Sequence, residues 1–492
     1  MKHRATTILK VSARSRSNKM GSIRELYEKS GQSALFEHWD RLSDAQKREF
    51  ERNLEATAAK NAPEKLVGDC KRAIELSSGD SDDVGAIKPL PSGSYESTLG
   101  EPAVEQEYRD LGLRELAEGR VAVILMAGGQ GTRLGSSQPK GCYDIQLPSA
   151  KSLFQIQAEK LLRLQELVKT PAPIPWYIMT SKPTRQSTEQ FFQDHEYFGL
   201  SKHQITFFNQ GTLPAFDLKG ENLLLNSPTE LVESPDGNGG LYRAIKDNGI
   251  LEDMVAKNIR HIHMYCVDNV LVKLADPVFI GFALKNKFEL ATKAVRKRDA
   301  SESVGLIASK HGAPCVVEYS EISKEMAEAT DKEGLLKFRA ANIVNHYYSV
   351  NLLQRELEAW CESMPYHIAK KKIPVYNNKT ESYLKPTEPN GIKLEQFIFD
   401  VFPKVAMDKF GCLEVDRSSE FSPLKNAPGT ANDNPETSRA AYLNLGTSWL
   451  EHAGAKVASG VLIEVPGKIS YGGEHLESYK GQSFNENLTI LH

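Results

Sequence analysis

Residues 121–141 read VAVILMAGGQGTRLGSSQPKG, and this stretch decides the fold. Its first seven residues are all apolar, and Gly128 ends the run. An unbroken apolar run of this length, closed by glycine, is typical of a strand buried on both faces of a parallel sheet. The sequence therefore predicts a central strand followed by a glycine-rich loop.

Strands and helices alternate after this loop. Residues 151–168 have the apolar spacing of a helix, and helical stretches separate several of the later apolar runs. Those runs are PWYIMT (175–180), ITFF (205–208), HIHMYCVDNV (261–270) and SVGLIAS (303–309). Such alternation predicts an α/β fold: a three-layer, Rossmann-like domain around a mixed, mostly parallel sheet.

The length predicts more than one domain, because 492 residues are too many for a single compact core. Residues 23–76 show helical spacing, and SDAQ at 43–46 has the spacing of a capping box. Residues 77–102 are rich in Ser, Gly, Pro and Asp, which is typical of a linker. We expect four contiguous regions: a basic, disordered extension (1–20), a helical region with its linker (21–104), the α/β domain (105–405) and a small C-terminal α+β lobe (406–492).

Composition excludes several classes of partner. The net charge is −3, from 61 basic and 64 acidic residues, so no overall charge favours nucleic acid or an anionic membrane. No run of 18 apolar residues could span a bilayer. The six cysteines are scattered without a C-x-x-C pair, which argues against zinc and a disulfide framework and for a reducing compartment. We expect a cytoplasmic protein that acts as a monomer.

The first twenty residues differ from the rest, since they hold six Lys or Arg and no acid. One interpretation is a mitochondrial transit peptide, although no clear amphipathic face is present. The alternative is a disordered basic arm, or an upstream extension before a start at Met20.

The glycine loop fits neither standard phosphate-binding template. The dinucleotide motif G-x-G-x-x-G requires glycine where Leu134 stands, and the P-loop requires glycine where Pro139 precedes the lysine. A dehydrogenase and a P-loop ATPase are thereby disfavoured. Two cations, Arg133 and Lys140, nevertheless follow the glycines and could neutralise a di- or triphosphate. The plainer alternative is a tight βα turn with two solvated cations.

The sequence G-G-x-G-T-R-L followed by P-K, at residues 128–140, is the signature of sugar-nucleotide pyrophosphorylases. Longer segments resemble the eukaryotic UDP-N-acetylhexosamine (UDP-N-acetylglucosamine) pyrophosphorylases, of the UDPGP type 1 family. They include PDGNGGLYRAI (235–245), HMYCVDNVLVKLADP (263–277), VVEYSEIS (316–323), NIVNHYYS (342–349), PNGIKLEQFIFD (389–400) and EFSPLKNA (420–427). The resemblance runs from about residue 23 to near the C-terminus.

The resemblance implies a nucleotidyltransferase that makes UDP-N-acetylglucosamine and pyrophosphate from UTP and N-acetylglucosamine 1-phosphate. This product would supply chitin, glycan and GPI-anchor synthesis. The sugar phosphate is already an anion, so the in-line attack on the α-phosphorus needs no general base. Cations and N–H-rich loops suffice, which agrees with the absence of a G-x-S-x-G or H-E-x-x-H motif. The implied cofactor is Mg²⁺, with Mn²⁺ as an alternative.

The resemblance also implies roles for residues on the nucleotide side. The segment against the uridine would be Met126, Ala127, Gly128 and Gly129. Gln210 would read the uracil edge, followed by Gly237 and Asn238 as further nucleotide contacts. The catalytic cations would be Arg133, Lys140 and Lys425, with Arg133 and Lys140 on the nucleotide phosphates and Lys425 on the sugar phosphate.

Metal and sugar contacts follow in the same way. Asp268 would bind Mg²⁺ between the two phosphates; a helix-capping role is its alternative. The residues implied for sugar binding are Gly305, Glu318, Asn342, Phe397 and Phe399, and which phenylalanine faces the sugar stays open. Because Lys425 lies near the start of the predicted C-terminal lobe, we expect that lobe to close over the site.

Three alternatives remain for the function. Two keep the chemistry and change the substrate to N-acetylgalactosamine 1-phosphate or glucose 1-phosphate. The third is a non-catalytic nucleotide-sugar binding protein, which predicts the loss of charged site residues. The sequence keeps all four charged residues that the resemblance implies for the phosphates and the metal: Arg133, Lys140, Asp268 and Lys425.

Overall fold

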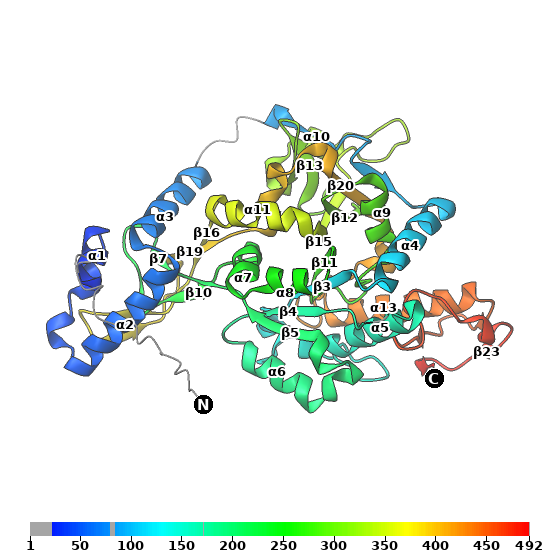
Figure 1. Cartoon of the computed structure of the whole chain (residues 1–492), viewed down its shortest axis with the longest axis horizontal. Helices are drawn as coiled ribbons and strands as arrows, with labels where there is room; N and C mark the ends of the chain where they lie inside the picture. Colours follow the sequence, from blue (N-terminus) through cyan, green and yellow to red (C-terminus); the bar gives the residue numbers. More distant parts are fainter. Residues whose placement is uncertain (1–21, 79–83, 171, 492) are drawn as a thin grey trace, which may run out of the picture. The chain divides into compact units, whose positions relative to one another are not determined.

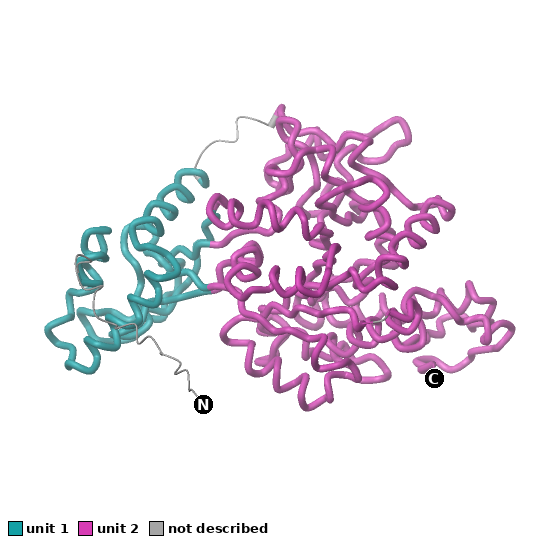
Figure 2. The backbone as a smooth tube through the Cα atoms, in the orientation of Figure 1, with its two compact units in different colours: residues 1–79, 212–234, 366–394 teal, residues 80–211, 235–365, 395–492 magenta. Residues whose placement is uncertain are grey.

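The computed structural model describes residues 22–78, 84–170 and 172–491 (Figure 1). These residues form two compact units (Figure 2). Unit 1 contains the described residues within 1–79 together with 212–234 and 366–394, and unit 2 contains those within 80–211, 235–365 and 395–492. Each unit thus combines segments that are distant in the sequence, unlike the contiguous regions that we expected. The predicted basic extension, 1–20, lies outside the described residues.

Unit 2 is built on a large mixed sheet, with eleven strands in the described part of the chain. Eight strands follow the order β2 (Tyr95–Ser97), β20 (Phe410–Val415), β12 (Leu290–Arg296), β15 (Ala340–Ser349), β11 (His261–Cys266), β3 (Val121–Met126), β4 (Trp176–Thr180) and β5 (Ile205–Asn209). Only β15 runs antiparallel to its neighbours along this path. Beside β15 lies β13 (Leu306–Lys310), which pairs antiparallel with β1 (Ile87–Lys88) and β14 (Ala313–Val317).

The central strand β3 is buried on both faces. Ala122, Ile124 and Met126 pack in a cluster with α7 (Leu241–Asp247), α8 (Ile250–Ala256) and α11 (Val350–Ser363). The alternate residues Val121, Val123 and Leu125 pack with α5 (Leu153–Val168), α6 (Arg185–Asp194) and α9 (Pro277–Asn286). Side chains alternate across a strand, so a run that is apolar at every position needs helices on both faces. The predicted three-layer α/β fold, with a mostly parallel sheet, is confirmed (Figure 1).

Three strands of this sheet come from segments that we expected to lie outside the α/β domain. Strands β1 and β2 fall in the predicted linker, 77–102, and β20 falls in the predicted C-terminal lobe. Strands β2 and β20 pair in parallel, with Tyr95 opposite Cys412. The three residues of β2 have no strand-like pattern of their own. Their extended form follows from the partner strand, which periodicity cannot show.

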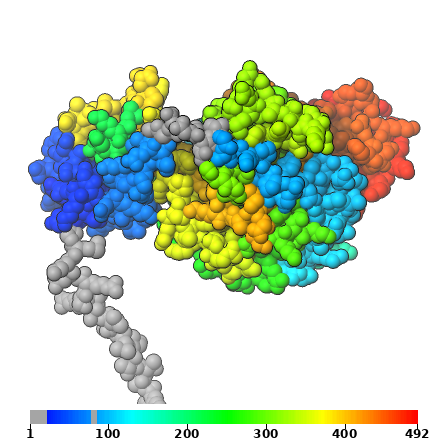
Figure 3. Space-filling model, turned by 90° about the horizontal axis from the view of Figure 1, so that it is seen from above, coloured from blue at the N-terminus to red at the C-terminus, as the bar shows by residue number. Residues whose placement is uncertain are grey.

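The C-terminal elements follow β20 within unit 2. They are α12 (Arg417–Glu420), α13 (Pro435–His452) and the short strands β21 (Lys456–Val457), β22 (Ile463–Glu464), β23 (Ser483–Phe484) and β24 (Thr489–Ile490). β21 pairs with β23, and β22 pairs with β24. In Figure 3 the last of these elements, coloured red, lie at the surface of unit 2. Elsewhere in unit 2, α4 (Pro102–Ala117) packs closely against α9, and α10 (Lys324–Glu328) precedes β15.

Unit 1 packs three helices and a small sheet around its own core. The helices are α1 (Ile23–Lys29), α2 (Asp44–Lys60) and α3 (Pro63–Ser78), and the sheet order is β16 (His367–Lys371), β19 (Gly391–Glu395) and β7 (Phe216–Asp217). The capping box predicted at 43–46 is confirmed, because Ser43 N–H donates to Gln46 Oε1 at 3.0 Å and the reciprocal bond starts α2. The remaining short strands are β6 (Thr212–Pro214), β8 (Leu225–Ser227), β9 (Glu230–Leu231), β10 (Glu233–Pro235), β17 (Val375–Asn377) and β18 (Ser382–Leu384).

None of the helices in the described part of the chain is both long and apolar enough to cross a bilayer.

Candidate functional site

The predicted nucleotide residues gather where four parallel strands end. Strands β11, β3, β4 and β5 are neighbours that point the same way, with Cys266, Met126 and Met179 in register. The loops after them therefore meet at one edge of the sheet. In open α/β sheets, ligands bind at the carboxyl ends of the strands.

The loop after β3 runs directly beside Gln210. Ala127 N–H donates to Met179 O at 2.8 Å, and Gly128 O accepts a bond from Ser181 Oγ at 2.7 Å. A Cβ added to Gly128 would lie 2.5 Å from Gln210 Oε1, so the glycine lets the amide of Gln210 lie directly against the loop. The structure thus brings Gln210 to the loop, with Met126 and Ala127 buried and Gly129 exposed.

The two cations of the loop are held differently. Lys140 Nζ lies 3.9 Å from Asp268 Oδ2, and each of these side chains is about one-fifth exposed. Arg133 is exposed in the turn η4 (Thr132–Leu134), and among the described residues it has no hydrogen-bond or ion-pair partner. A guanidinium without a protein partner is free to bind an anion.

Lys140 is placed by tight packing of its own turn. The turn η5 (Lys140–Cys142) follows Pro139, and Lys140 N–H donates to Gly129 O at 3.2 Å. A Cβ on Gly141 would lie 2.1 Å from the nearest ring atom of Phe154 in α5. The missing side chain at Gly141 lets the turn rest directly on the helix.

Asp268 and Lys425 come together through backbone pairing. Leu424 N–H donates to Asp268 O at 2.9 Å, next to the exposed Lys425. Burial raises the pKa of the Cys266 thiol; the Asp268 charge raises it further, while Lys425 and Lys140 oppose this. All three charges therefore lie close enough to Cys266 to act on it, which places Lys140, Asp268 and Lys425 in one region.

The segment with Gly237 and Asn238 joins the nucleotide side to the sugar side. Gly237 has φ +88°, and a Cβ there would lie 2.5 Å from Gln396 O. Asn238 Oδ1 accepts a hydrogen bond from Ile398 N–H at 2.9 Å. The segment that carries Phe397 is thereby fixed beside the predicted nucleotide contacts.

Three predicted sugar residues also lie together. Asn342 N–H donates to Gly305 O at 2.9 Å, while Asn342 Oδ1 accepts from Val344 N–H at 3.0 Å. Glu318 Oε1 is 3.6 Å from the point that a Cβ on Gly305 would occupy. Glu318 is exposed, and Asn342 is half-buried.

Phe397 and Phe399 are both half-buried, with ring centroids 5.3 Å apart. Phe399 packs against the hydrophobic cluster between the sheet and α11. Phe397 N–H donates to Asp400 Oδ2 at 2.9 Å, at the start of η10 (Ile398–Lys404).

Asn342 and Lys425 line one polar cavity of about 340 Å³. Two arginines that sequence reasoning missed, Arg298 and Arg417, line it as well. Arg417 Nη2 is bound to Glu302 at 3.0 Å. The volume is within the range of small-molecule pockets. The run RKRD at 296–299 contains Arg298 and was a signal for that arginine in the sequence.

Asp236 is a second residue that sequence reasoning missed. Burial raises the pKa of its carboxyl to about 7. Its Oδ1 has no hydrogen-bond partner among the described residues, and Cβ atoms on Gly211 and Gly240 would lie within 2.4 Å of its oxygens. Its backbone O accepts from Gln396 N–H at 2.8 Å, so it links the loop after Gln210 to the segment before Phe397. A perturbed carboxyl in such a place is typical of functional sites.

The described residues contain no cluster of three or more His, Cys, Asp or Glu side chains that could hold a metal by themselves. All six cysteines are free thiols. Mg²⁺ at nucleotide sites needs only one or two carboxylates, because phosphates and water complete its shell. Asp268, with a partly exposed carboxylate beside Lys140, fits that requirement.

Comparison with known proteins adds a family match. A model of the UDPGP family, described as UTP–glucose-1-phosphate uridylyltransferase, matches residues 83–430. The chain is 65% identical to UDP-N-acetylglucosamine pyrophosphorylase of Saccharomyces cerevisiae over 475 residues, covering 96% of this chain and 100% of the relative. It is 42% identical to UDP-N-acetylhexosamine pyrophosphorylase-like protein 1 of Xenopus tropicalis, covering 93% of each.

A solved structure is similar across nearly the whole chain. The uridine diphosphate N-acetylglucosamine pyrophosphorylase of Trypanosoma brucei, in complex with an inhibitor, matches with a TM-score of 0.80 and 27% identity. The match covers 94% of this chain and 95% of that one.

Proposed function

Because the chain belongs to the UDPGP family of UTP–glucose-1-phosphate uridylyltransferases, we propose that it makes UDP-N-acetylglucosamine and pyrophosphate from UTP and N-acetylglucosamine 1-phosphate. The observation that carries the proposal is the convergence of Lys140, Asp268 and Lys425 beside the glycine loop. Two polyanions must meet there, and this cluster offers two cations and a carboxylate to receive them.

The nucleotide lies along Met126–Gly129 in this proposal. Gln210 is next to Gly128 and presents an amide, which can both donate to and accept from a uracil edge. A base that leaves those bonds unmade is rejected, and this gives specificity for uridine. Gly237 and Asn238 complete the nucleotide contacts.

Lys140 and Arg133 bind the triphosphate, and Lys425 binds the sugar phosphate. The sugar phosphate oxygen attacks the α-phosphorus in line, and pyrophosphate leaves opposite to it. The cations stabilise the charge that spreads over the phosphate oxygens. Mg²⁺, or Mn²⁺ in its place, would be held by Asp268 and by phosphate oxygens, and it would supply additional charge stabilisation.

The sugar lies against Gly305, Glu318 and Asn342 in this proposal. A carboxylate and an amide suit sugar hydroxyls, since they provide acceptors and donors. Phe399 packs against the core cluster, so we assign Phe397 to the sugar or its acetyl methyl group.

We also propose that the protein works in the cytoplasm as a monomer. The free state of all six cysteines agrees with a reducing compartment.

The test is pyrophosphate release by the purified chain with UTP and Mg²⁺, using the 1-phosphates of N-acetylglucosamine, N-acetylgalactosamine, glucose and galactose. We expect release to be highest with N-acetylglucosamine 1-phosphate. Similar release with N-acetylgalactosamine 1-phosphate would show that the site discriminates only weakly at the C4 hydroxyl. Highest release with glucose 1-phosphate would overturn the sugar assignment, and release with none would favour a non-catalytic binding protein.

A further inference from the structure

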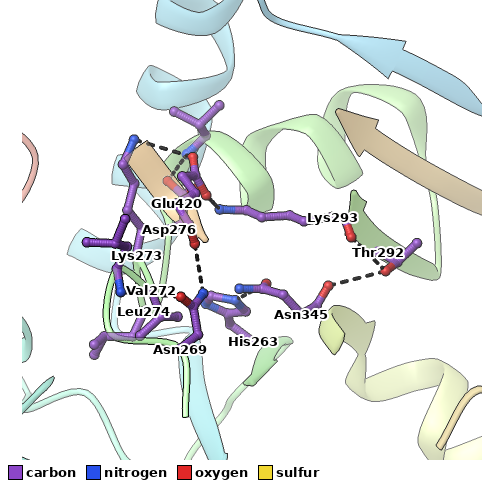
Figure 4. Close-up of polar contacts among 12 residues, drawn as sticks. His263, Asn269, Val272, Lys273, Leu274, Asp276, Thr292, Lys293, Asn345 and Glu420 are labelled. Atoms are coloured by element: carbon purple, nitrogen blue, oxygen red, sulfur yellow. Dashed lines mark hydrogen bonds and ion pairs between the residues drawn. The ribbon is translucent and has the colours of Figure 1, made fainter. Parts of the chain in front are cut away.

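A network of charged side chains lies beside the loop that carries Asn269 (Figure 4). Lys293, on β12, is fully buried and donates to Asp276 Oδ2 at 2.5 Å and to Glu420. Lys273 Nζ lies 3.3 Å from the other oxygen of Glu420. Two lysines thus balance two carboxylates. Buried charges are tolerated when they are paired in this way, and removing one partner is costly.

Asn269 connects this network to Asp268, the predicted metal ligand. It follows Asp268 directly, and only 4% of it is exposed. Its Nδ2 donates to Glu420 O at 2.7 Å, and its Oδ1 accepts from Ser422 N–H at 3.0 Å. One side chain therefore fastens the loop after β11 to the segment that leads to Lys425.

The backbones on either side of Asn269 continue this pairing. Leu424 N–H donates to Asp268 O at 2.9 Å, and Val270 N–H donates to Ser422 O at 3.1 Å. From the other side, the buried Lys160 of α5 donates to Val272 O at 2.9 Å. The loop is thus held on two sides.

The side chains of Asp268 and Lys425 are not themselves packed in place. Asp268 is half-buried and Lys425 is exposed. They also come from distant parts of the sequence, so their separation depends on how the two backbones are fastened together. Small displacements of catalytic groups cost large factors in rate.

We propose that Asn269 is a positioning residue for the transfer reaction. Lys273 and Lys293 fix Glu420, and Glu420 in turn binds Asn269. Asn269 thereby holds the backbones of Asp268 and Lys425 at the separation that the two phosphates and the metal require. This inference rests on the proposed function, because it takes the roles of Asp268 and Lys425 from there.

The test compares Asn269→Ala with a matched control, Gln204→Ala, in the full chain. Gln204 is also buried, and its Nε2 donates to Ile174 O at 2.9 Å before β5 begins, at the opposite edge of the sheet. Both variants lose a buried amide. We expect Asn269→Ala to lower kcat by about 10- to 100-fold, the range for residues that orient metal ligands, with KM for UTP unchanged.

A second readout does not depend on turnover. Mn²⁺ binding to the protein with UDP-N-acetylglucosamine is measured by electron paramagnetic resonance. We expect Asn269→Ala to weaken this binding about tenfold. Gln204→Ala should lower the melting temperature while leaving kcat and Mn²⁺ affinity unchanged. If Asn269→Ala lowers only the melting temperature, the network is merely structural and the inference is wrong.

Two more variants keep the outcomes separate. Asp268→Asn and Lys425→Ala are assayed in the same way. If these two variants keep the wild-type rate, the proposed site is wrong. If both lose activity while Asn269→Ala keeps the wild-type rate, only the inference about Asn269 is wrong. If Asn269→Ala does not fold, Lys273→Met replaces it, because Lys273 is partly exposed and Lys293 still neutralises Glu420. A lowered kcat in Lys273→Met supports the inference, and a wild-type kcat and Mn²⁺ affinity overturn it.

Discussion

Lys140 and Arg133 follow the same glycine loop, yet the fold treats them differently. Lys140 is placed by the packing of Gly141 on Phe154 and lies near a carboxylate, whereas Arg133 is exposed without a protein partner. We interpret Lys140 as a preorganised charge, positioned before the substrate binds, and Arg133 as a side chain that becomes ordered when phosphate binds. Preorganised charges contribute most to stabilising a transition state, because they need no rearrangement.

Lys140→Ala should lower kcat by about 10²- to 10³-fold, the cost of removing one preorganised donor at a developing charge. The fold should be unaffected, since an ion pair of 3.9 Å at a partly exposed site contributes little to stability. Pyrophosphate release and the melting temperature check this. Lys324→Ala is the control, because that lysine is 86% exposed on α10. Near-normal turnover in Lys140→Ala would show that the lysine does not bind the reacting phosphates.

At the scale of elements, the site depends on close contact between turns and helices. The turn η5 rests on α5 through Gly141, and the loop after β3 touches Gln210 through Gly128. Each contact occurs where a Cβ would collide with another element. The glycines therefore set the distance between elements as well as the path of the loop.

Gly141→Ala should displace either the Phe154 ring or the turn that carries Lys140, because the added Cβ would lie 2.1 Å from the ring. We expect a loss of about 1–3 kcal/mol in the free energy of unfolding, as for overpacked cores, together with reduced kcat. Urea denaturation and pyrophosphate release measure the two effects. Gly472→Ala is the matched control, since a Cβ there meets nothing within 4 Å. Unchanged stability and rate in Gly141→Ala would mean that the turn can relax without consequence.

At the scale of the whole molecule, two histidines lie fully buried in the central sheet of unit 2. Burial lowers the pKa of His263 to about 4, with Lys293 as the next cause. Burial also lowers the pKa of His346 to about 3. Both are therefore neutral at pH 7, and His263 Nε2 is bonded to Asn345 Oδ1 at 2.5 Å.

Stability should fall as the pH drops from 6.5 towards 4. A histidine whose pKa is lower in the folded state takes up its proton first in the unfolded state, so acid favours unfolding in this range. For His263, the shift from 6.5 to about 4 corresponds to about 3 kcal/mol. Urea denaturation at a series of pH values measures the slope.

The slope should be shallower in His263→Gln and unchanged in the exposed control His452→Gln. The comparison between variants is needed because the titration of Asp236 changes the free energy of unfolding with pH in the opposite direction. Burial raises the pKa of Asp236 from 3.8 to about 7, so its contribution to stability is full below pH 3.8 and is lost as the pH rises from there to 7. Equal slopes in wild type and His263→Gln would contradict the assignment of His263 as a neutral buried group.

Much of the site could be predicted because its signals are local. The glycines and cations of residues 128–140 are consecutive, and their spacing alone excluded two other phosphate-binding motifs. Asp236 and Asn269 could not be predicted. Each looks like an ordinary loop residue in the sequence, and its importance comes from burial and from partners such as Gln396 and Glu420. Burial of this kind depends on several distant segments at once.

The sequence by itself determined the alternation of strands and helices, the buried central strand and the chemistry of its loop, because hydrophobic period and glycine spacing are written in consecutive residues. Only the tertiary structure decided that β2 and β20 complete the sheet and that the loop of Asp268 is fastened to the segment of Lys425. Strand partners and buried polar bonds are contacts between residues far apart in the chain. They form only when packing brings those residues together, and no local pattern specifies them.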